Sequence, residues 1–185
     1  MRWALGPALA FGLGAAPALA GCFTPQEPPR RVVYDQGITL EYLGVDGDVL
    51  TYRSGEVTTR MQAGLWPLSQ EVQGRTTEYV WDGPLPDLAQ IAAQGGKAEV
   101  RGQMQRPDGT AVPVMARIEV LGHSTRDWED CRYDLVEYRK GMTVDGETLP
   151  ESVHLYAPAA MVAFRSQLMD AAGGAATVYS LSELH

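Results

Sequence analysis

The residues best able to do chemistry are one cysteine and three histidines in the second half of the chain: Cys131, His123, His154 and His185. A metal ion needs deprotonated ligands that converge at about 2 Å, and no H-x-x-x-H or C-x-x-C spacing supplies them locally. A nucleophilic Cys131 needs a base or a cation to lower its pKa, but the adjacent Arg132 points to the other face of a strand. The sequence therefore predicts no metal, no cofactor and no enzyme, and favours Cys131 in the core. Only a fold that joins His123, Cys131 and His154 would change this expectation.

Two carboxylates flank a glycine in Asp46-Gly47-Asp48, which superficially resembles part of a calcium loop. Calcium binds six to eight oxygens, and the chain turns back into a strand directly after this segment. A hairpin turn explains the segment without an ion.

The densest cluster of charge around an aromatic side chain is Arg126-Asp127-Trp128-Glu129-Asp130. We predict that it lies on a polar loop spanning residues 122–130, and loops carry a large share of binding residues. Arg126, Trp128, Glu129 and Asp130 are therefore the candidate binding residues. The other interpretation, which we favour, is a solvated loop with Trp128 folded back on the sheet.

Most of the chain from Val32 onward alternates apolar and polar residues, which is typical of strands with one apolar face. The clearest hairpin joins residues 98–105 to residues 112–120 through Pro107-Asp108-Gly109. Gly102 stands in its inward row, which predicts a close approach of backbone or of a ring. Residues 161–169 permit either a helix or a strand, and we favour a strand.

One short helix interrupts the strands near residues 87–94. Asp87 is placed to cap it, Gln90 stands where a capping-box partner belongs, and Gly95-Gly96 ends it. A helix of two turns is not stable alone, so we expect it to pack on the sheet.

About ten short strands with one helix predict a mainly β protein. The expected architecture is an antiparallel meander that curls into an open or closed barrel or a sandwich. Residues 31–185 are expected to form this single domain, and residues 22–30, with three prolines, an extended tether. The net charge is −8 and the basic residues are scattered, so nucleic acid is not an expected partner.

The first 21 residues have the character of a secretory signal peptide, because Arg2 precedes a short apolar run. That run is too short and too often broken by Gly and Pro for a permanent membrane span. Leu19-Ala20-Gly21-Cys22 resembles the lipobox of bacterial lipoproteins. The resemblance implies cleavage before Cys22 and acylation of that cysteine, palmitate included, so that the protein is anchored to a membrane in the periplasm. Phe23 stands where the family's inner-membrane retention signal has Asp, which favours the outer membrane.

Ordinary signal cleavage after Ala20 is the alternative, and it leaves Cys22 unmodified. A disulfide between Cys22 and Cys131 then becomes possible, whereas acylation of Cys22 leaves Cys131 alone in an oxidising compartment. Sequence spacing does not decide between these two states.

These observations favour a non-enzymatic, membrane-anchored module that binds an envelope protein or another envelope component. Its binding face is expected around Trp128 together with any exposed aromatic residue among Tyr42, Tyr52, Trp66, Tyr79 and Trp81. The alternative function is a carrier whose curled sheet encloses a lipid or another hydrophobic ligand.

Overall fold

The computed structural model describes residues 22–185, so the predicted signal peptide lies outside the described residues. This part of the chain forms strands and one short helix. The elements are β1 (Arg31–Tyr34), β2 (Thr39–Asp46), β3 (Val49–Ser54), β4 (Val57–Gln62), β5 (Trp66–Val72), β6 (Arg75–Trp81), α1 (Leu88–Ala93), β7 (Lys97–Gln105), β8 (Ala111–Trp128), β9 (Cys131–Val144), β10 (Glu147–Thr148), β11 (Ser152–Ala157), β12 (Val162–Met169) and β13 (Ala175–Leu184).

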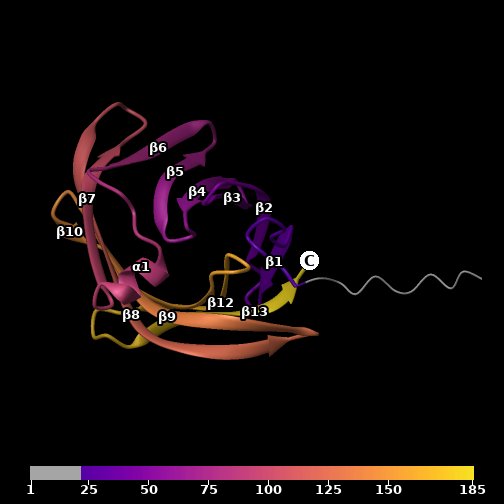
Figure 1. The fold of residues 1–185 in the computed structure, drawn as a ribbon. Coiled ribbons are helices and arrows are strands. Elements are labelled where there is room, and N and C mark those ends of the chain that lie inside the picture. The colour runs from indigo at the N-terminus through magenta and orange to yellow at the C-terminus, as the bar shows by residue number, and fades with distance from the viewer. Residues whose placement is uncertain (1–21) are drawn as a thin grey trace, which may run out of the picture.

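Twelve of these strands close into one antiparallel barrel (Figure 1). Strands β1 to β9 pair in chain order, β11 follows β9, and β13 returns to pair with β1. The two-residue strand β10 pairs with β9 outside this ring. The predicted fold class is confirmed, and the architecture is a closed barrel, in which each wall strand has a partner on both sides.

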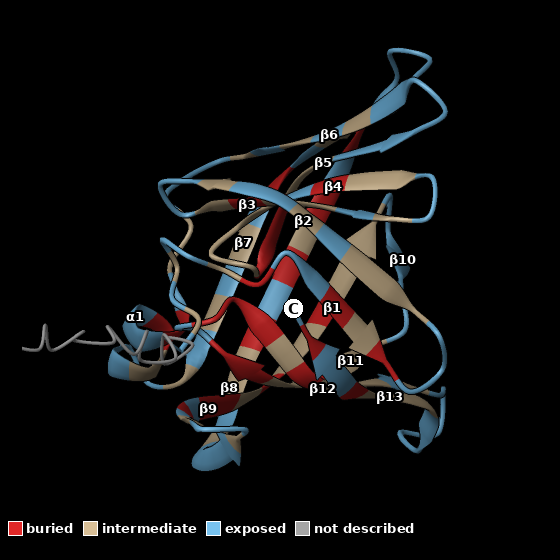
Figure 2. Ribbon diagram, turned by 90° about the vertical axis from the view of Figure 1, so that its right-hand side faces the viewer, coloured by how far each residue is buried: buried red, intermediate tan, exposed pale blue. Residues whose placement is uncertain are grey.

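A barrel of this size has more interior than its wall side chains fill, because the diameter grows with the number of strands and about eight strands already suffice for a filled interior. The helix α1, the loop of residues 63–65 and the loop of residues 158–161 enter one end of the barrel, which we name the helix end. Figure 2 shows α1 and β10 at opposite ends, and we name the other end the β10 end.

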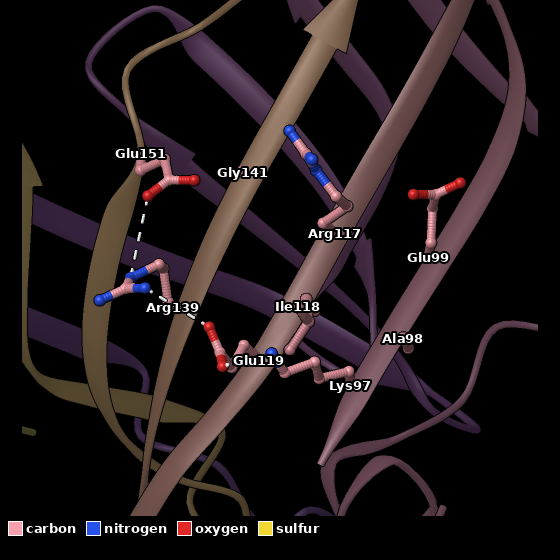
Figure 3. Close-up of a pocket in the computed structure, with 9 residues that line it drawn as sticks. All are labelled: Lys97, Ala98, Glu99, Arg117, Ile118, Glu119, Arg139, Gly141 and Glu151. Atoms are coloured by element: carbon pink, nitrogen blue, oxygen red, sulfur yellow. Dashed lines mark hydrogen bonds and ion pairs between the residues drawn. The ribbon is translucent and has the colours of Figure 1, made fainter. Parts of the chain in front are cut away.

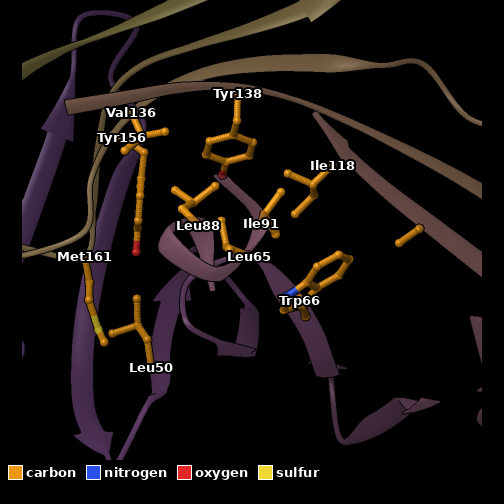
Figure 4. Close-up of a cluster of buried hydrophobic side chains, with 11 residues drawn as sticks. Leu50, Leu65, Trp66, Leu88, Ile91, Ile118, Val136, Tyr138, Tyr156 and Met161 are labelled. Carbon is orange, nitrogen blue, oxygen red and sulfur yellow. The ribbon is translucent and has the colours of Figure 1, made fainter. Parts of the chain in front are cut away.

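The predicted helix is present and capped as expected. Asp87 accepts a hydrogen bond from the Gln90 backbone N–H, and the Gln90 side chain accepts one from the Asp87 backbone N–H. Leu88 and Ile91 are buried, and Figure 4 shows them among Tyr138 and other side chains of the barrel interior. The helix is thus stabilised by packing inside the barrel.

Two expectations for the strands are confirmed. A Cβ atom on Gly102 would lie 2.2 Å from the Val80 carbonyl oxygen on β6, so the backbones approach there as closely as its position in the inward row predicted. Residues 162–169 form β12, as favoured, and the strand pairs on both sides with β11 and β13.

The predicted polar loop over residues 122–130 is instead the last part of strand β8 and the tight turn that leads into β9. Strand β8 continues to Trp128, and the turn consists of Glu129 and Asp130, with Glu129 at φ 50°. Residues 123–127 are exposed, so no face there carries an apolar row, and the alternation that identifies a strand is missing. A bulge between Val120 and Gly122 also changes the register.

The segment expected to be an extended tether, residues 22–30, lies against the helix end of the barrel. Thr24 and Glu27 exchange two backbone hydrogen bonds of 3.1 Å each, which close a turn. Pro29 is fully buried, and the backbone N–H groups of Arg30 and Arg31 donate to the carbonyl of His185. Proline favours turns as well as extended chain, and the turn allows this segment to pack. Among the described residues, no helix is long and apolar enough to span a bilayer.

A ligand cavity inside the barrel

The interior of the barrel contains a cavity of about 480 Å³. Its wall extends from Gly64 and Met161 at the helix end to Leu149, which is 39% exposed beside β10. The cavity therefore reaches the surface at the β10 end. The lining residues are Tyr34, Leu40, Tyr42, Leu50, Tyr52, Met61, Gly64, Pro67, Gln70, Tyr79, Tyr138, Lys140, Met142, Leu149, Ser152, His154, Tyr156, Met161, Ala163 and Ser166.

Tyrosines form much of the wall, and several of them also hold the loops that enter the helix end. The Tyr42 hydroxyl donates to the Met161 carbonyl at 2.7 Å, and the Tyr156 hydroxyl donates to the Ala63 carbonyl at 3.3 Å. Burial raises the pKa of both phenols. They are therefore neutral at physiological pH and offer the cavity their apolar ring faces.

Lys140 on β9 is the only lysine in the cavity wall, and the wall includes no Asp, Glu or Arg. Its ammonium group donates to the carbonyl of Leu65, in the loop that enters the barrel. Burial lowers the pKa of Lys140 to about 8, because leaving water disfavours the charged form. At pH 7 the amine is still mostly protonated.

His154 on β11 lies between two serines. Its Nδ1 is 3.0 Å from Ser166 Oγ and its Nε2 is 2.8 Å from Ser152 Oγ, while its ring stacks on Tyr138 with centroids 5.0 Å apart. Burial, and to a lesser extent the Lys140 cation, lower the pKa of His154 to about 4. The imidazole is therefore neutral at pH 7, with one nitrogen that donates and one that accepts.

Strand register brings these polar groups together. Tyr138 lies opposite His154 and Lys140 lies opposite Ser152, because β9 and β11 are antiparallel neighbours. Residues two apart share a face of a strand, so Lys140 follows Tyr138 into the interior while Arg139 between them faces outward. Of this polar group, only His154 was named from the sequence, and there as a possible metal ligand with His123 and Cys131. The only signal for it in the sequence is a lysine within an otherwise apolar inward row.

A serine at 2.8 Å from an imidazole is also the geometry of a nucleophile and its base. The lowered pKa of His154 makes it a weak base at neutral pH. A catalytic histidine is commonly oriented by a carboxylate, and the residues that line this cavity include none. The arrangement is better suited to hydrogen bonding than to proton transfer.

The predicted binding cluster on β8 packs against the barrel. The Trp128 ring meets Phe164 edge to face with centroids 5.7 Å apart, and the Arg126 guanidinium lies over both rings. Trp128 is thus folded back on the sheet, as we favoured from the sequence. Glu129 and Asp130 are exposed in the turn.

None of the five aromatic residues considered for an exposed binding face is exposed, and they belong to the interior instead. Tyr42, Tyr52 and Tyr79 line the cavity. Trp66 is completely buried, and Trp81 packs against it. The inward rows of the barrel need large side chains, which is the physical reason for the difference.

The histidines and Cys131 do not converge. His154 lies inside the barrel, His123 is exposed on β8, and His185 pairs with Glu183 at 2.8 Å. Within residues 22–185, no three His, Cys, Asp or Glu side chains are placed to hold a metal ion.

Cys22 and Cys131 form a disulfide at the helix end, with Cα atoms 5.5 Å apart. The adjacent Phe23 N–H donates to the Tyr133 hydroxyl at 3.2 Å. This is the second of the two states considered for Cys22. It excludes an acyl group on the same sulfur, so the two states cannot coexist in one molecule.

A second hollow of about 360 Å³ lies on the outer face of β7, β8 and β9 (Figure 3). Glu119 contacts Lys97 at 2.9 Å and Arg139 at 3.4 Å, and Arg139 contacts Glu151 at 3.8 Å. Basic and acidic residues are equally numerous in its lining. The charges largely neutralise one another, so this surface has little net field to attract a charged ligand.

No family model matches the chain, and no curated protein matches it in sequence. Among solved structures, the chain is similar to the crystal structure of the hypothetical lipoprotein YmcC from Escherichia coli K12. The two are 11% identical with a TM-score of 0.47, over 83% of this chain and 85% of that chain. No functional conclusion follows from a likeness at this level.

Proposed function

We propose that the protein is a non-enzymatic binding module of the cell envelope that holds a ligand with a large apolar part inside its barrel. The cavity of about 480 Å³ carries this proposal. Its volume lies in the range of small-molecule sites, and its mainly aromatic and aliphatic wall with few polar groups is typical of them.

Native mass spectrometry after gentle extraction from cells tests this function. We expect a bound small molecule on the wild-type protein and its loss in Met61→Trp, because the larger ring would occupy the cavity. Leu43→Trp is the matched control, because Leu43 on β2 is 53% exposed on the outer surface of the barrel. This variant should retain the ligand. Protein that is always empty and takes up no added hydrophobic probe would contradict the proposal.

The proposed location is the periplasmic side of the outer membrane, with acylated Cys22 as the anchor. The support is the apolar leader, the lipobox-like Leu19-Ala20-Gly21-Cys22 and Phe23 after it. An anchor at Cys22 would turn the helix end toward the membrane and leave the mouth of the cavity, at the β10 end, facing away.

Intact mass of the membrane-extracted protein tests the anchor. We expect an acylated Cys22 and a free Cys131 thiol, so the anchored form would lack the Cys22–Cys131 disulfide described above. An unmodified chain with both cysteines oxidised to a disulfide would show that the protein is exported without a lipid anchor.

A partner protein of the envelope is the second proposal, and the exposed hairpin of β8 and β9 supports it. A pull-down from membranes should recover a partner with the wild-type chain and less of it after Glu129→Ala. Failure to recover any partner would count against this role and would leave the cavity unaffected.

A further inference from the structure

We infer that the ligand of the cavity is an amphipathic anion, an apolar chain that ends in a carboxylate, and that its carboxylate binds Lys140. This inference rests on the proposed function of the cavity as a ligand site. It adds the chemical class of the ligand and the residue that selects it.

The first support is the missing counter-ion of Lys140. A protonated lysine has three N–H donors, and the hydrogen bond seen here is to the Leu65 carbonyl. None of the ion pairs among the described residues includes Lys140, and no carboxylate lines the cavity. Lys140 is half-buried, and a cation withdrawn from water without a partner is costly, so an anionic ligand would lower that cost.

The second support is a hydroxyl that is free to donate. A neutral His154 accepts a hydrogen bond at one nitrogen and donates at the other, and both of its partners are serines. One serine must therefore donate to the ring, while the other accepts and keeps its own O–H. Whichever tautomer is present, one of Ser152 and Ser166 has a hydrogen to offer an anion. Ser152 is also the cross-strand partner of Lys140.

The third support is the contrast between this polar group and the rest of the wall. Each methylene that an apolar chain buries contributes about 0.8 kcal/mol. A single cation complements a singly charged head group, which favours a carboxylate over a doubly charged phosphate monoester. The aliphatic residues available to the chain are Leu40, Leu50, Met61, Met142, Met161 and Ala163.

The charge on Lys140 also predicts a pH dependence. Besides Lys140, the titratable groups that face the cavity are His154, Tyr138 on the same strand as Lys140, and, from other strands, the tyrosines Tyr34, Tyr42, Tyr52, Tyr79 and Tyr156. The lowered pKa of His154 and the raised pKa values of these tyrosines keep them mostly neutral between pH 7 and 9.5. Since the pKa of Lys140 is about 8, any loss of anion preference in this range would come from Lys140.

The test compares dodecanoate with dodecanol, which share one chain and differ in charge, by titration calorimetry at pH 7 and pH 9.5. Wild-type protein should bind dodecanoate at least about tenfold more tightly than dodecanol at pH 7, as expected for hydrogen bonds to a charged group. This preference should decrease at pH 9.5. Lys140→Met should bind both ligands equally, while Lys97→Met, which removes the other lysine of the chain at an exposed site, should behave as wild type.

The outcomes separate the two proposals. If wild-type protein binds neither ligand, the cavity function fails. If it binds both equally and Lys140→Met changes nothing, the cavity function stands and the assignment of Lys140 is wrong. Tighter binding of dodecyl phosphate than of dodecanoate would overturn the carboxylate. The pH comparison on wild-type protein gives the same answer if Lys140→Met fails to fold.

Discussion

The two lysines of the chain occupy opposite environments on the same barrel wall. Lys97 lies on the outer face of β7, where its ammonium group pairs with Glu119 and its side chain is 74% exposed. Lys140 lies on the inner face of β9, in a cavity whose wall contains no carboxylate. One lysine is solvated and paired, and the other is half-buried in the cavity wall without an ionic partner.

This difference shows where a ligand is needed. Exposed ion pairs such as those in the outer hollow contribute about 0–1 kcal/mol each, so Lys97 and its neighbours are adequately explained by solubility. Lys140, half-buried in the cavity wall without a counter-ion, opposes folding, and a group of this kind in a cavity is a candidate for function. The outer face and the interior can therefore be tested against each other.

The largest difference between the interior and the outer face is expected in the free energy of unfolding when a side chain is truncated. Trp66→Ala should lower the free energy of unfolding by about 3–5 kcal/mol, because a fully buried ring leaves a cavity. Val80→Ala, at a site that is 50% exposed on the outer wall, should change it by less than about 0.5 kcal/mol. Urea unfolding measures both. Similar losses for the two variants would mean that the interior is not the core of the fold.

The second contrast concerns acid. The pKa of His154 is about 4 in the folded protein and ordinarily 6.5, so between these values the unfolded chain binds the proton more readily. Stability should therefore fall by up to about 3 kcal/mol as the pH decreases from 6.5 to 4. His154→Gln should lose this dependence, whereas His185→Gln should keep it. Urea unfolding at several pH values between 4 and 6.5 measures this dependence. If His154→Gln lost as much stability in acid as the wild type, the effect would not come from His154.

The third contrast returns to the two lysines at alkaline pH. The pKa of Lys140 is about 8 when folded and ordinarily 10.5, so the unfolded chain holds more protons between these values. Stability of the ligand-free protein should rise by about 1–2 kcal/mol from pH 8 to 9.5. Denaturant unfolding should show the rise in Lys97→Met and not in Lys140→Met. A rise in both variants would assign it to another group.

The smallest effect is expected on the outer face. Arg139→Ala removes contacts to Glu119 and Glu151, yet it should cost less than about 1 kcal/mol because these charges are solvated. The cost should vanish in 1 M salt, where charges are screened within about 3 Å. A larger loss that persists in salt would show that the outer ion pairs do stabilise the barrel.

Local features of the fold were predictable from the sequence, whereas the cavity was not. The capping box of Asp87 and Gln90 and the close approach at Gly102 depend on residues near in sequence or on a single missing Cβ atom. The polar group of Lys140, Ser152 and His154 depends on the register between β9 and β11. Alternation along one strand does not specify which residues of another strand lie opposite.

The docking of the N-terminal segment shows the same limit. Its prolines are compatible with an extended tether and with a turn, and the buried position of Pro29 exists only because the barrel provides a surface there. Residues 123–127 of β8 are exposed on both faces of the strand, so the alternation that identifies a strand was absent from the sequence there.

The amino-acid sequence by itself determined the strand content and the capped helix, because these depend on periodicity and on short motifs. Only the tertiary structure decided that the sheet closes, that Lys140 faces inward and Arg139 outward, and that a cavity remains between α1 and β10. The physical reason is that closure and register are set by contacts between residues far apart in the chain, and these contacts determine which side chains lose water.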